Sequence, residues 1–553
     1  MKKYIYLAII IILSACTSDY VDVNTNIYGA TDEDIKMDGL AYGAPFMRMQ
    51  QLVIPIGSPD KTTGPGNDLQ VTDLISSGNY IGYFGNNNNW DFNIESNWNF
   101  TEGRMKYAYE NFYSNMFRQW NDINILASRS DDPSDQQILA LANIVKITAW
   151  LRATDVFGPI VYTNAGSGSI APSLDAQNVV YKNMLSDLAS AVEVLKKAPA
   201  RVLEKYDAIY DGSTTKWIKF ANSLMLRMAV RVHFQDKALA QEYIAKALNP
   251  ANGGVISNTD EEAKIKNSPK MPLLNSFIPS VEEYKETRMG TTIWSYLGGY
   301  SDPRRSAYFT TGRYDNMFGY YAVAPANLFP KRTGTNTAEF ASKPKVTNDT
   351  PIYWLRASEV LFLKSEAVLF GLIAGDAKQL YESGVKMSFL ENNVTGADSY
   401  LTYTDKPQNL TTSLYKYGGI YANFFTRYSF NLSERNTSPK WDDFNPESTL
   451  SNQEQQFQKI ITQKYLALYP NAVEAWTEYR RTGYPFIMPP FDTSAPGRIG
   501  SEDSFAPERF RFAPSEYSNN PNMSDVPTLL GGEDIGSTKL WWVRNDRPKQ
   551  IRN

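Results

Sequence analysis

Amphipathic helices explain most of the hydrophobic pattern along this chain of 553 residues. In the clearest case, apolar residues recur at the i, i+3, i+4 and i+7 positions that share one face of a helix. That helix carries Tyr181, Met184, Leu185, Leu188, Ala191, Val192 and Leu195. Two other segments place the following residues on one face: Leu141, Ile144, Val145, Thr148 and Leu151, and then Trp217, Phe220, Ala221, Leu224 and Met228. Each such face needs a packing partner, so the pattern predicts helices that pack against one another.

Two more helices are predicted later in the chain, over about residues 353–369 and 455–479. The helix that carries Leu141 is predicted to begin at a capping box, in which Ser134 and Gln137 stand three residues apart after Pro133. Small residues stand beside large ones within the predicted helices, as in the pairs Ala149–Trp150 and Ala475–Trp476. Such pairs favour close helix–helix packing.

Long polar insertions separate these helices. They are rich in Gly, Pro, Asn and Ser, which mark loops, and they cover residues 58–101, 250–288, 310–351 and 393–453. Loops of this length are often functional. The paired helices are similar to tetratricopeptide units, but no fixed period of about 34 residues is present. The sequence therefore predicts a mainly α fold, an irregular, tetratricopeptide-like scaffold of helical hairpins with long loop insertions.

The first residues carry signals of export and lipid attachment. Lys2 and Lys3 precede an apolar run over residues 4–15, which is too short for a membrane span of about 20 residues and is typical of a secretory signal peptide. Leu13-Ser14-Ala15-Cys16 resembles a bacterial lipobox, and Cys16 is the only cysteine. The alternative is an ordinary signal peptide with a chance cysteine. We predict a lipoprotein signal peptide over residues 1–15, a lipidated tether over residues 16–34, and a single ligand-binding domain over residues 35–553.

Composition and charge exclude several function classes. Apolar residues make up 42% and charged residues 21% of the chain, as in ordinary globular proteins. A net charge of −4 argues against nucleic acid as a partner, because phosphate binding needs a basic surface. The only histidine, His233, is interpreted as a partly buried helix residue. No histidine is then available for a catalytic triad or a zinc site. A pair of carboxylates is the remaining enzymatic option, and nothing singles one out among 59 Asp and Glu residues. We therefore predict no enzyme activity, no cofactor and no metal site.

Six segments, taken in order, carry a resemblance to one known family. Residues 155–162, Asp-Val-Phe-Gly-Pro-Ile-Val-Tyr, are similar to the D-x-F-G-P-I-P-Y stretch of SusD-like proteins, with Val161 where Pro is usual. The other five segments resemble further motifs of that family and are residues 217–231, 355–367, 463–465, 474–485 and 509–542. The order of these six segments, together with the lipobox that precedes them, resembles the SusD/RagB family of nutrient-binding lipoproteins.

The resemblance implies capture and delivery of a nutrient. Such proteins are lipid-anchored on the cell-surface side of the outer membrane and sit as a lid on a SusC-like TonB-dependent transporter. They bind an oligosaccharide, or in some members a peptide, and no cofactor is implied. In this family the motif residues stabilise the scaffold, and the loops bind the ligand. The charged motif residues are accordingly interpreted as scaffold, and Arg480 and Arg481 as ion-paired with nearby carboxylates; they are Arg227, Arg231, Arg356, Glu359, Arg480 and Arg481.

Two of the insertions carry the residues that a sugar site needs, aromatic rings beside Asn and Asp. The predicted ligand-binding residues are Tyr83, Trp90 and Trp98 in the first insertion, and Tyr314, Tyr320 and Tyr321 in the second. The alternative for each ring is local packing, and for Trp294 and Tyr296, on a predicted helix, packing is preferred. Two further hypotheses are a surface glycoside hydrolase, with two carboxylates about 5–10 Å apart, and a helical scaffold that binds only proteins. An exposed aromatic patch where the two loops meet would favour the ligand-binding hypothesis.

Overall fold

Helices make up most of the structure, a computed structural model that describes residues 39–57, 67–86, 101–284, 287–311, 342–409, 436–488 and 506–548. The main helices of the first half are α4 (Leu40–Val53), α8 (Glu102–Tyr109), α9 (Asn115–Ala127), α10 (Pro133–Phe157), α11 (Gln177–Leu195), α12 (Thr214–Val232) and α13 (Lys237–Leu248). Those of the second half are α14 (Thr291–Gly299), α15 (Arg304–Tyr308), α16 (Ala357–Leu369), α17 (Ala377–Glu391), α21 (Asn452–Leu468) and α22 (Ala472–Thr482).

Short helical turns connect or extend these helices. They are α5 (Asn67–Leu69), η1 (Gln70–Ser77), α6 (Gly78–Tyr80), η2 (Glu110–Ser114), η3 (Pro250–Asn252), η4 (Pro279–Glu283), α18 (Ala397–Tyr400), α23 (Pro514–Asn519), η8 (Pro521–Asp525) and α24 (Val526–Leu530).

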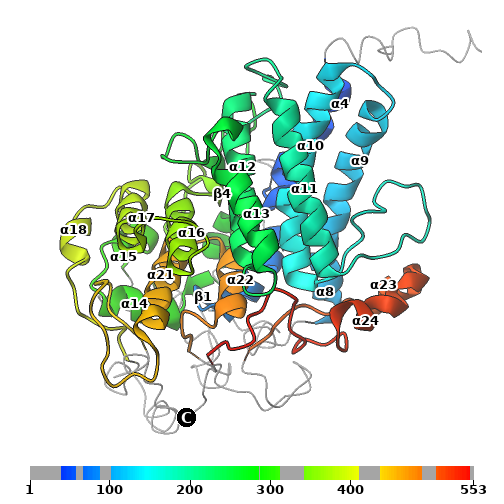
Figure 1. Ribbon diagram of the computed structural model, residues 1–553. Helices are drawn as coiled ribbons and strands as arrows, with labels where there is room; N and C mark the ends of the chain where they lie inside the picture. The colour runs from blue at the N-terminus through cyan, green and yellow to red at the C-terminus, as the bar shows by residue number, and fades with distance from the viewer. Residues whose placement is uncertain are drawn as a thin grey trace, which may run out of the picture.

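Consecutive helices pack as hairpins, α10 against α11, α12 against α13 and α16 against α17. The hairpins are joined because α11 packs on α12, and α12 packs on α16. Figure 1 shows α4, α9, α10 and α11 gathered at one side of the molecule, with α16, α17 and α21 at the other. The prediction of a mainly α scaffold of irregular helical hairpins is confirmed.

The three predicted amphipathic faces are buried in α10, α11 and α12. The start of α10 differs from the predicted capping box. Asp132 is the N-cap, and its carboxylate accepts a hydrogen bond from the backbone N–H of Ser134 at 2.9 Å. Pro133 then takes the first helical position, where a residue without an N–H leaves no donor unpaired. The N-cap therefore lies two residues before the predicted one.

Two predicted helices have different bounds in the structure. The start of the segment predicted as a helix over residues 353–369 is a strand, β4 (Ile352–Leu355), whose β-branched and aromatic residues favour an extended backbone. The segment over residues 455–479 is divided into α21 and α22, because Pro470 cannot donate a backbone hydrogen bond within a helix. Asn471 then caps α22 by accepting from the backbone N–H of Glu474 at 3.4 Å.

Part of the first insertion is regular structure and not a loop. Residues 67–80 form one continuous helical stretch, α5, η1 and α6. Val71, Leu74 and Ile75 are buried there at the i, i+3, i+4 spacing of an amphipathic helix. The high Gly and Asn content of the whole insertion hid this short pattern, so the prediction of a loop over residues 58–101 is wrong for this part.

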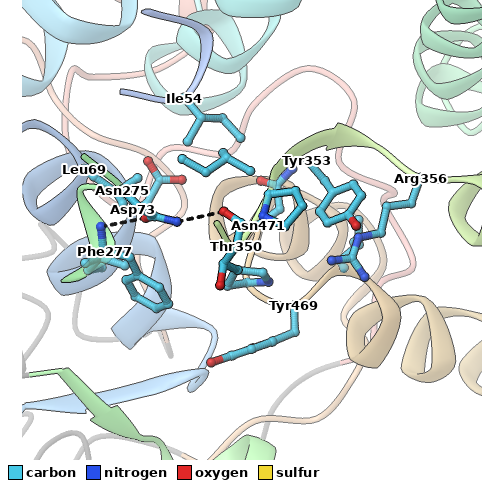
Figure 2. Close-up of a pocket in the computed structure, with 15 residues that line it drawn as sticks. Ile54, Leu69, Asp73, Asn275, Phe277, Thr350, Tyr353, Arg356, Tyr469 and Asn471 are labelled. Carbon is cyan, nitrogen blue, oxygen red and sulfur yellow. Dashed lines mark hydrogen bonds between the residues drawn. The ribbon is translucent and has the colours of Figure 1, made fainter. Parts of the chain in front are cut away.

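Two small antiparallel sheets are present in the described ranges. β1 (Phe84–Asn86) pairs with β3 (Thr287–Met289), and β2 (Ala263–Ile265) pairs with β4 in the register Ala263↔Leu355. β4 leads directly into α16. Together with the turn between α21 and α22, it borders a pocket that Figure 2 shows from close by.

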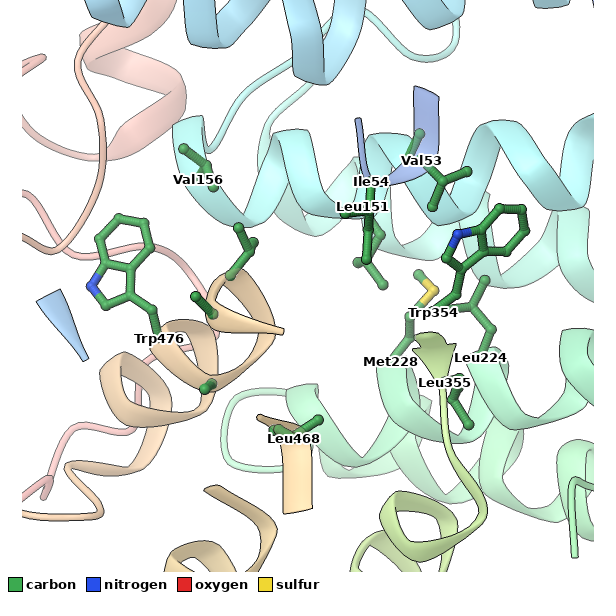
Figure 3. Close-up of a cluster of buried hydrophobic side chains, with 14 of the residues drawn as sticks. Val53, Ile54, Leu151, Val156, Leu224, Met228, Trp354, Leu355, Leu468 and Trp476 are labelled. Carbon is green, nitrogen blue, oxygen red and sulfur yellow. The ribbon is translucent and has the colours of Figure 1, made fainter. Parts of the chain in front are cut away.

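Hydrophobic side chains fill the space where α10, α12, β4 and α22 approach one another. Figure 3 shows Trp354 of β4 beside Leu224 and Met228 of α12. Trp476 of α22 and Val156 of α10 occupy the other end of the same cluster. Each fully buried side chain of this size contributes roughly 1.5–3 kcal/mol relative to exposure. The cluster therefore fixes the relative positions of four elements that are far apart in sequence.

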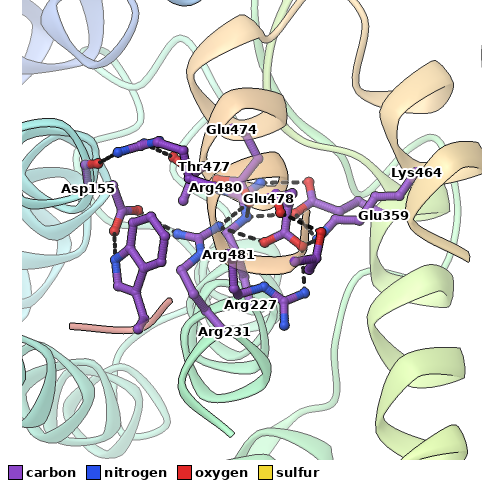
Figure 4. A network of polar contacts seen from close by, with 12 residues as sticks. Asp155, Arg227, Arg231, Glu359, Lys464, Glu474, Thr477, Glu478, Arg480 and Arg481 are labelled. Atoms are coloured by element: carbon purple, nitrogen blue, oxygen red, sulfur yellow. Dashed lines mark hydrogen bonds and ion pairs between the residues drawn. The ribbon is translucent and has the colours of Figure 1, made fainter. Parts of the chain in front are cut away.

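A second cluster in the core is made of charged side chains, and we call it the buried charge network. Its members are Asp155, Arg227, Arg231, Glu359, Glu366, Lys464, Glu474, Glu478, Arg480 and Arg481, all buried. Five are cations and five are carboxylates, so their formal charges cancel. They come from α10, α12, α16, α21 and α22, and Figure 4 shows most of them meeting between these helices.

Bidentate contacts hold the network together. Arg227 donates to both carboxylate oxygens of Glu359 at 2.7 and 2.6 Å. Arg481 donates to both oxygens of Glu366 at 2.6 and 2.8 Å, and also to Glu478 at 2.6 Å. Such paired N–H···O bonds are the strongest that a guanidinium makes with a carboxylate. The contacts with Glu359 and Glu366 join α16 to α12 and to α22, respectively.

Arg231 bridges three further carboxylates. Its guanidinium contacts Asp155 at 2.5 Å and Glu478 at 3.5 Å, and it also donates to Glu474. Arg480 differs, because it donates to the backbone carbonyls of Asp155 and Glu508 at 2.6 and 2.9 Å. The scaffold interpretation of Arg227, Arg231, Glu359, Arg480 and Arg481 is therefore confirmed, although the predicted ion pair of Arg480 is wrong.

Removing one buried cation tests the network. We expect Arg231→Ala to lower the free energy of unfolding by about 3–5 kcal/mol, because Asp155 and Glu474 then keep buried charges without their partner. The matched control is Lys246→Ala, which breaks an exposed pair with Glu242 and should cost no more than about 0.5 kcal/mol. Urea unfolding followed by circular dichroism measures both. Equal stability losses in the two variants would contradict the network's role.

Candidate ligand-binding site

A pocket lies at the junction of β4, the start of α16, and the turn between α21 and α22. The empty space up to and including its open mouth is about 540 Å³. The lining residues are Ile54, Leu69, Asp73, Leu74, Asn275, Phe277, Thr350, Pro351, Ile352, Tyr353, Arg356, Leu468, Tyr469, Pro470 and Asn471. Most of this wall is apolar, and a few polar groups interrupt it (Figure 2).

Two of the polar groups are already used by the scaffold. One oxygen of Asp73 accepts from Arg152 at 2.6 Å, and the other accepts from the hydroxyl of Thr72 at 2.6 Å. The Asn275 side chain donates to the carbonyl of Thr350 at 3.0 Å and accepts from the backbone N–H of Phe277 at 3.0 Å. These side chains shape the pocket more than they offer free hydrogen-bonding capacity.

Arg356, the residue between β4 and α16, is the exception among the motif arginines. It is only 8% exposed, and its guanidinium carbon lies 3.9 Å from the centre of the Tyr353 ring. In the described part of the chain, the nearest carboxylate oxygen belongs to Glu391, 3.8 Å from Nη1. Nη1 makes no hydrogen bond to any described residue. The scaffold interpretation therefore leaves the donor capacity of Arg356 unexplained.

Glu391 is a buried carboxyl group beside this arginine. It accepts from the backbone N–H and the hydroxyl of Ser358, both at 2.7 Å. Burial raises the pKa of Glu391 to about 8, the charge of Glu262 adds to the rise, and Arg356 opposes it. The carboxyl group therefore holds its proton at neutral pH in the folded protein.

Tyr83 is a core residue, which corrects the expectation of an exposed ring at this position. Its side chain is 0% exposed and stacks on Tyr465 with 4.6 Å between the ring centres. Its hydroxyl donates to the carbonyl of Tyr465. The neighbouring rings of Tyr80 and Phe84 are buried as well. The local helix and β1 turn all three rings inward, and Tyr83 offers no surface to a ligand.

The other predicted site residues lie outside the described residues. They are Cys16, Trp90, Trp98, Tyr314, Tyr320 and Tyr321. The meeting of the two aromatic loops therefore stays a prediction. The pocket beside β4 was not predicted, because its walls come from five separate parts of the chain and no local pattern connects them. The break at Pro470, which forms one edge, was the only local signal.

Three predictions about core residues are confirmed. Trp294 and Tyr296 are buried in α14. His233, at the end of α12, is 7% exposed, and its Nε2 lies 3.0 Å from Glu366. Burial lowers the pKa of His233, so it is a neutral core group at physiological pH. Among the described residues, no three His, Cys, Asp or Glu side chains gather as a metal site, and no helix is long and apolar enough to cross a membrane.

Comparison with known sequences and structures gives consistent results. The sequence profile of a family described as "Susd and RagB outer membrane lipoprotein" matches residues 22–543. A search of curated proteins finds no match. Among solved structures, that of BT1043 is similar to this chain with a TM-score of 0.87 and 62% identity, covering 93% of this chain and 100% of the other.

More distant structures share the same fold. A SusD homologue from Bacteroides vulgatus is 28% identical, with a TM-score of 0.80, over 93% of this chain and 100% of the other. A chitin-binding SusD homologue from Flavobacterium johnsoniae is 27% identical, with a TM-score of 0.75, over 92% of this chain and 99% of the other. The fold is thus shared over nearly the whole chain at low as well as high identity.

The raised pKa of Glu391 makes stability depend on pH. Below about pH 4.5, the ordinary pKa of a glutamate, Glu391 is protonated in both the folded and the unfolded state, and its contribution to the free energy of unfolding is complete. As pH rises, the unfolded chain releases the proton first, and the contribution is lost as pH passes through about 8. We expect the wild-type free energy of unfolding to fall by about 2–3 kcal/mol relative to Glu391→Gln between pH 6 and pH 9.

Urea unfolding of both proteins at several pH values checks this expectation. Gln keeps an acceptor for the backbone N–H of Ser358 but cannot titrate. The control is Glu242→Gln, an exposed carboxylate on α13, which should follow the wild-type curve. Parallel curves for the wild type and Glu391→Gln would show that Glu391 is ionised in the folded protein.

Proposed function

The chain belongs to the SusD-like family of SusD and RagB outer membrane lipoproteins, and we propose that it captures an oligosaccharide nutrient at the cell surface. The match of the family profile over residues 22–543 is the observation that carries this proposal. The chitin-binding relative from Flavobacterium johnsoniae supports an oligosaccharide as the ligand class. A peptide is the alternative ligand, and the resemblance allows it in some family members.

We propose delivery to a transporter as the second part of the function. The partner is a SusC-like TonB-dependent transporter in the outer membrane, on which this protein sits as a lid. Attachment is through a lipid at Cys16, the only cysteine of the chain. Several acyl chains together hold a protein stably at a membrane, whereas one chain gives only weak binding.

The charged groups of the described residues fit a protein that captures its ligand without covalent chemistry. A glycoside hydrolase needs two carboxyl groups about 5–10 Å apart and open to substrate. The carboxylates of the buried charge network are enclosed and paired with arginine or lysine. The chitin-binding relative is also described as a binding protein. These observations support a binding protein and make a hydrolase the weaker hypothesis.

Sugar binding is proposed to use the rings of the two insertions that carry Trp90 and Tyr320. Aromatic faces pack on the C–H faces of pyranose rings, and Asn and Asp side chains bind the hydroxyls. One buried ring face contributes about 1.5–3 kcal/mol. After ordering costs, two rings give affinities near millimolar to high micromolar, since 1 mM corresponds to about −4 kcal/mol. Binding of this strength allows release into the transporter.

Substitution of the rings tests the site. We expect Trp90→Ala and Tyr320→Ala each to weaken oligosaccharide binding by about 1–3 kcal/mol, with little change in melting temperature. The control is Tyr83→Ala, which removes a buried, hydrogen-bonded ring and should lower the melting temperature while affinity at permissive temperature is kept. Calorimetric titration on chitin oligosaccharides and a panel of other glycans measures affinity. Unchanged affinity in both loop variants, with binding intact, would move the site elsewhere.

Replacement of the proposed lipidated residue tests the anchor. Cys16→Ala should release the protein from the outer-membrane fraction, because no acyl chain can then be attached. Circular dichroism should show the same helical content as the wild type, since Cys16 lies before the described fold. Membrane fractionation with radiolabelled palmitate measures the effect. A variant that stays membrane-bound and labelled would show that the anchor lies elsewhere.

Purification from native membranes tests the partner. In mild detergent, the affinity-tagged protein should bring down a large β-barrel transporter in a fixed ratio. Cells grown on the nutrient that induces the protein are the appropriate source. Recovery of the protein only as a free monomer from such cells would contradict the transporter partnership.

A further inference from the structure

The pocket beside β4 contains a buried cation with unused hydrogen-bond donors. A guanidinium has five N–H donors, and burying such a group without acceptors is costly. Arg356 is 92% removed from solvent, yet its Nη1 has no hydrogen-bond partner among the described residues. Figure 2 shows its guanidinium pointing back from α16 toward the side of the pocket between Tyr353 and Tyr469. An acceptor on a ligand could hydrogen-bond to the part of the guanidinium that lines the pocket.

The charges around the pocket do not neutralise Arg356. Asp73 pairs with Arg152 at 2.6 Å. Glu262, which also contacts the start of α16, has Lys264 at 3.4 Å. Glu391 lies 3.8 Å from Arg356 but keeps its proton at neutral pH, because burial raises its pKa to about 8. One positive charge is therefore left over, and it belongs to Arg356.

A second donor faces the same space. Asn471 lines the pocket, and its side-chain oxygen caps α22 by accepting from the backbone N–H of Glu474. The NH₂ group of that amide has no partner among the described residues. In this largely apolar pocket, a planar guanidinium and an amide NH₂ offer donors, and the hydroxyl of Tyr469, unpartnered within the described ranges, can donate as well. This combination favours a ligand group that consists of acceptors alone and carries negative charge.

We propose that the pocket binds the carboxylate of an acidic sugar residue, with Arg356 as the charged donor and Asn471 as the neutral one. The inference rests on the proposed function and narrows it to glycans that contain uronic acids or similar acidic sugars. The apolar wall of Ile352, Phe277 and Leu468 contacts the C–H groups next to the carboxylate. A peptide carboxylate has the same headgroup chemistry and is distinguished by experiment.

Titration calorimetry at pH 6.5 tests the pocket with four probes. These are glucuronate, its uncharged methyl ester, a tripeptide with a free C-terminal carboxylate, and the same tripeptide amidated. Glucuronate should bind at least tenfold more tightly than its methyl ester, because hydrogen bonds to charged groups are the stronger ones. Arg356→Gln should remove that difference, whereas Arg201→Gln, an exposed arginine outside the pocket, should retain it.

Each outcome decides the proposal. Equal binding of glucuronate and its methyl ester overturns the inference, and intact binding of neutral oligosaccharides in the same preparation leaves the proposed function standing. Binding of the free tripeptide without glucuronate overturns the assignment to a sugar. If Arg356→Gln fails to fold, the structure of a wild-type crystal soaked with glucuronate tests the proposal instead. A carboxylate within hydrogen-bond distance of Arg356 supports the proposal, and a different position or an empty pocket overturns it.

Discussion

The rest of the structure depends on the mutual neutralisation of ten buried charges between α10, α12, α16, α21 and α22. A single buried ion is expensive to remove from water, so each member is stable only while its partners are in place. Bidentate contacts such as those of Arg481 with Glu366 also require a fixed distance and angle between two helices. The network thus adds fixed distances and angles between helices that the hydrophobic core also holds together.

This constraint separates the scaffold from the surfaces that are free to bind. Most donors and acceptors of the network residues are used within the network or by the backbone, and none of the carboxylates is open to a substrate. Arg356 stands one residue before α16, and its Nη1 has no hydrogen-bond partner in the part of the chain that the structure describes. α16 therefore contributes Glu359 and Glu366 to the buried charge network, and Arg356, just before its start, lines a pocket.

The sequence predicted those features that local pattern determines. The faces of α10, α11 and α12 follow from helical periodicity, and the scaffold role of Arg231 and Arg481 follows from the family motifs. The bounds of β4 and the break at Pro470 were misjudged, because a helical pattern was extended across residues that favour a strand or cannot donate. Tyr83 was misassigned because a Gly- and Asn-rich insertion conceals a short helix that buries its rings. The pocket could not be predicted, since it depends on five segments brought together only by the tertiary fold.

Amide hydrogen exchange with and without a bound oligosaccharide tests the central claim, that a rigid charged scaffold carries a separate binding surface. The account predicts ligand-dependent protection around Trp90, Tyr320 and the β4 pocket. It also predicts equally slow exchange in α12 and α22 in both states, because the network is complete without ligand. Ligand-dependent protection concentrated in α12 and α22 would contradict the account.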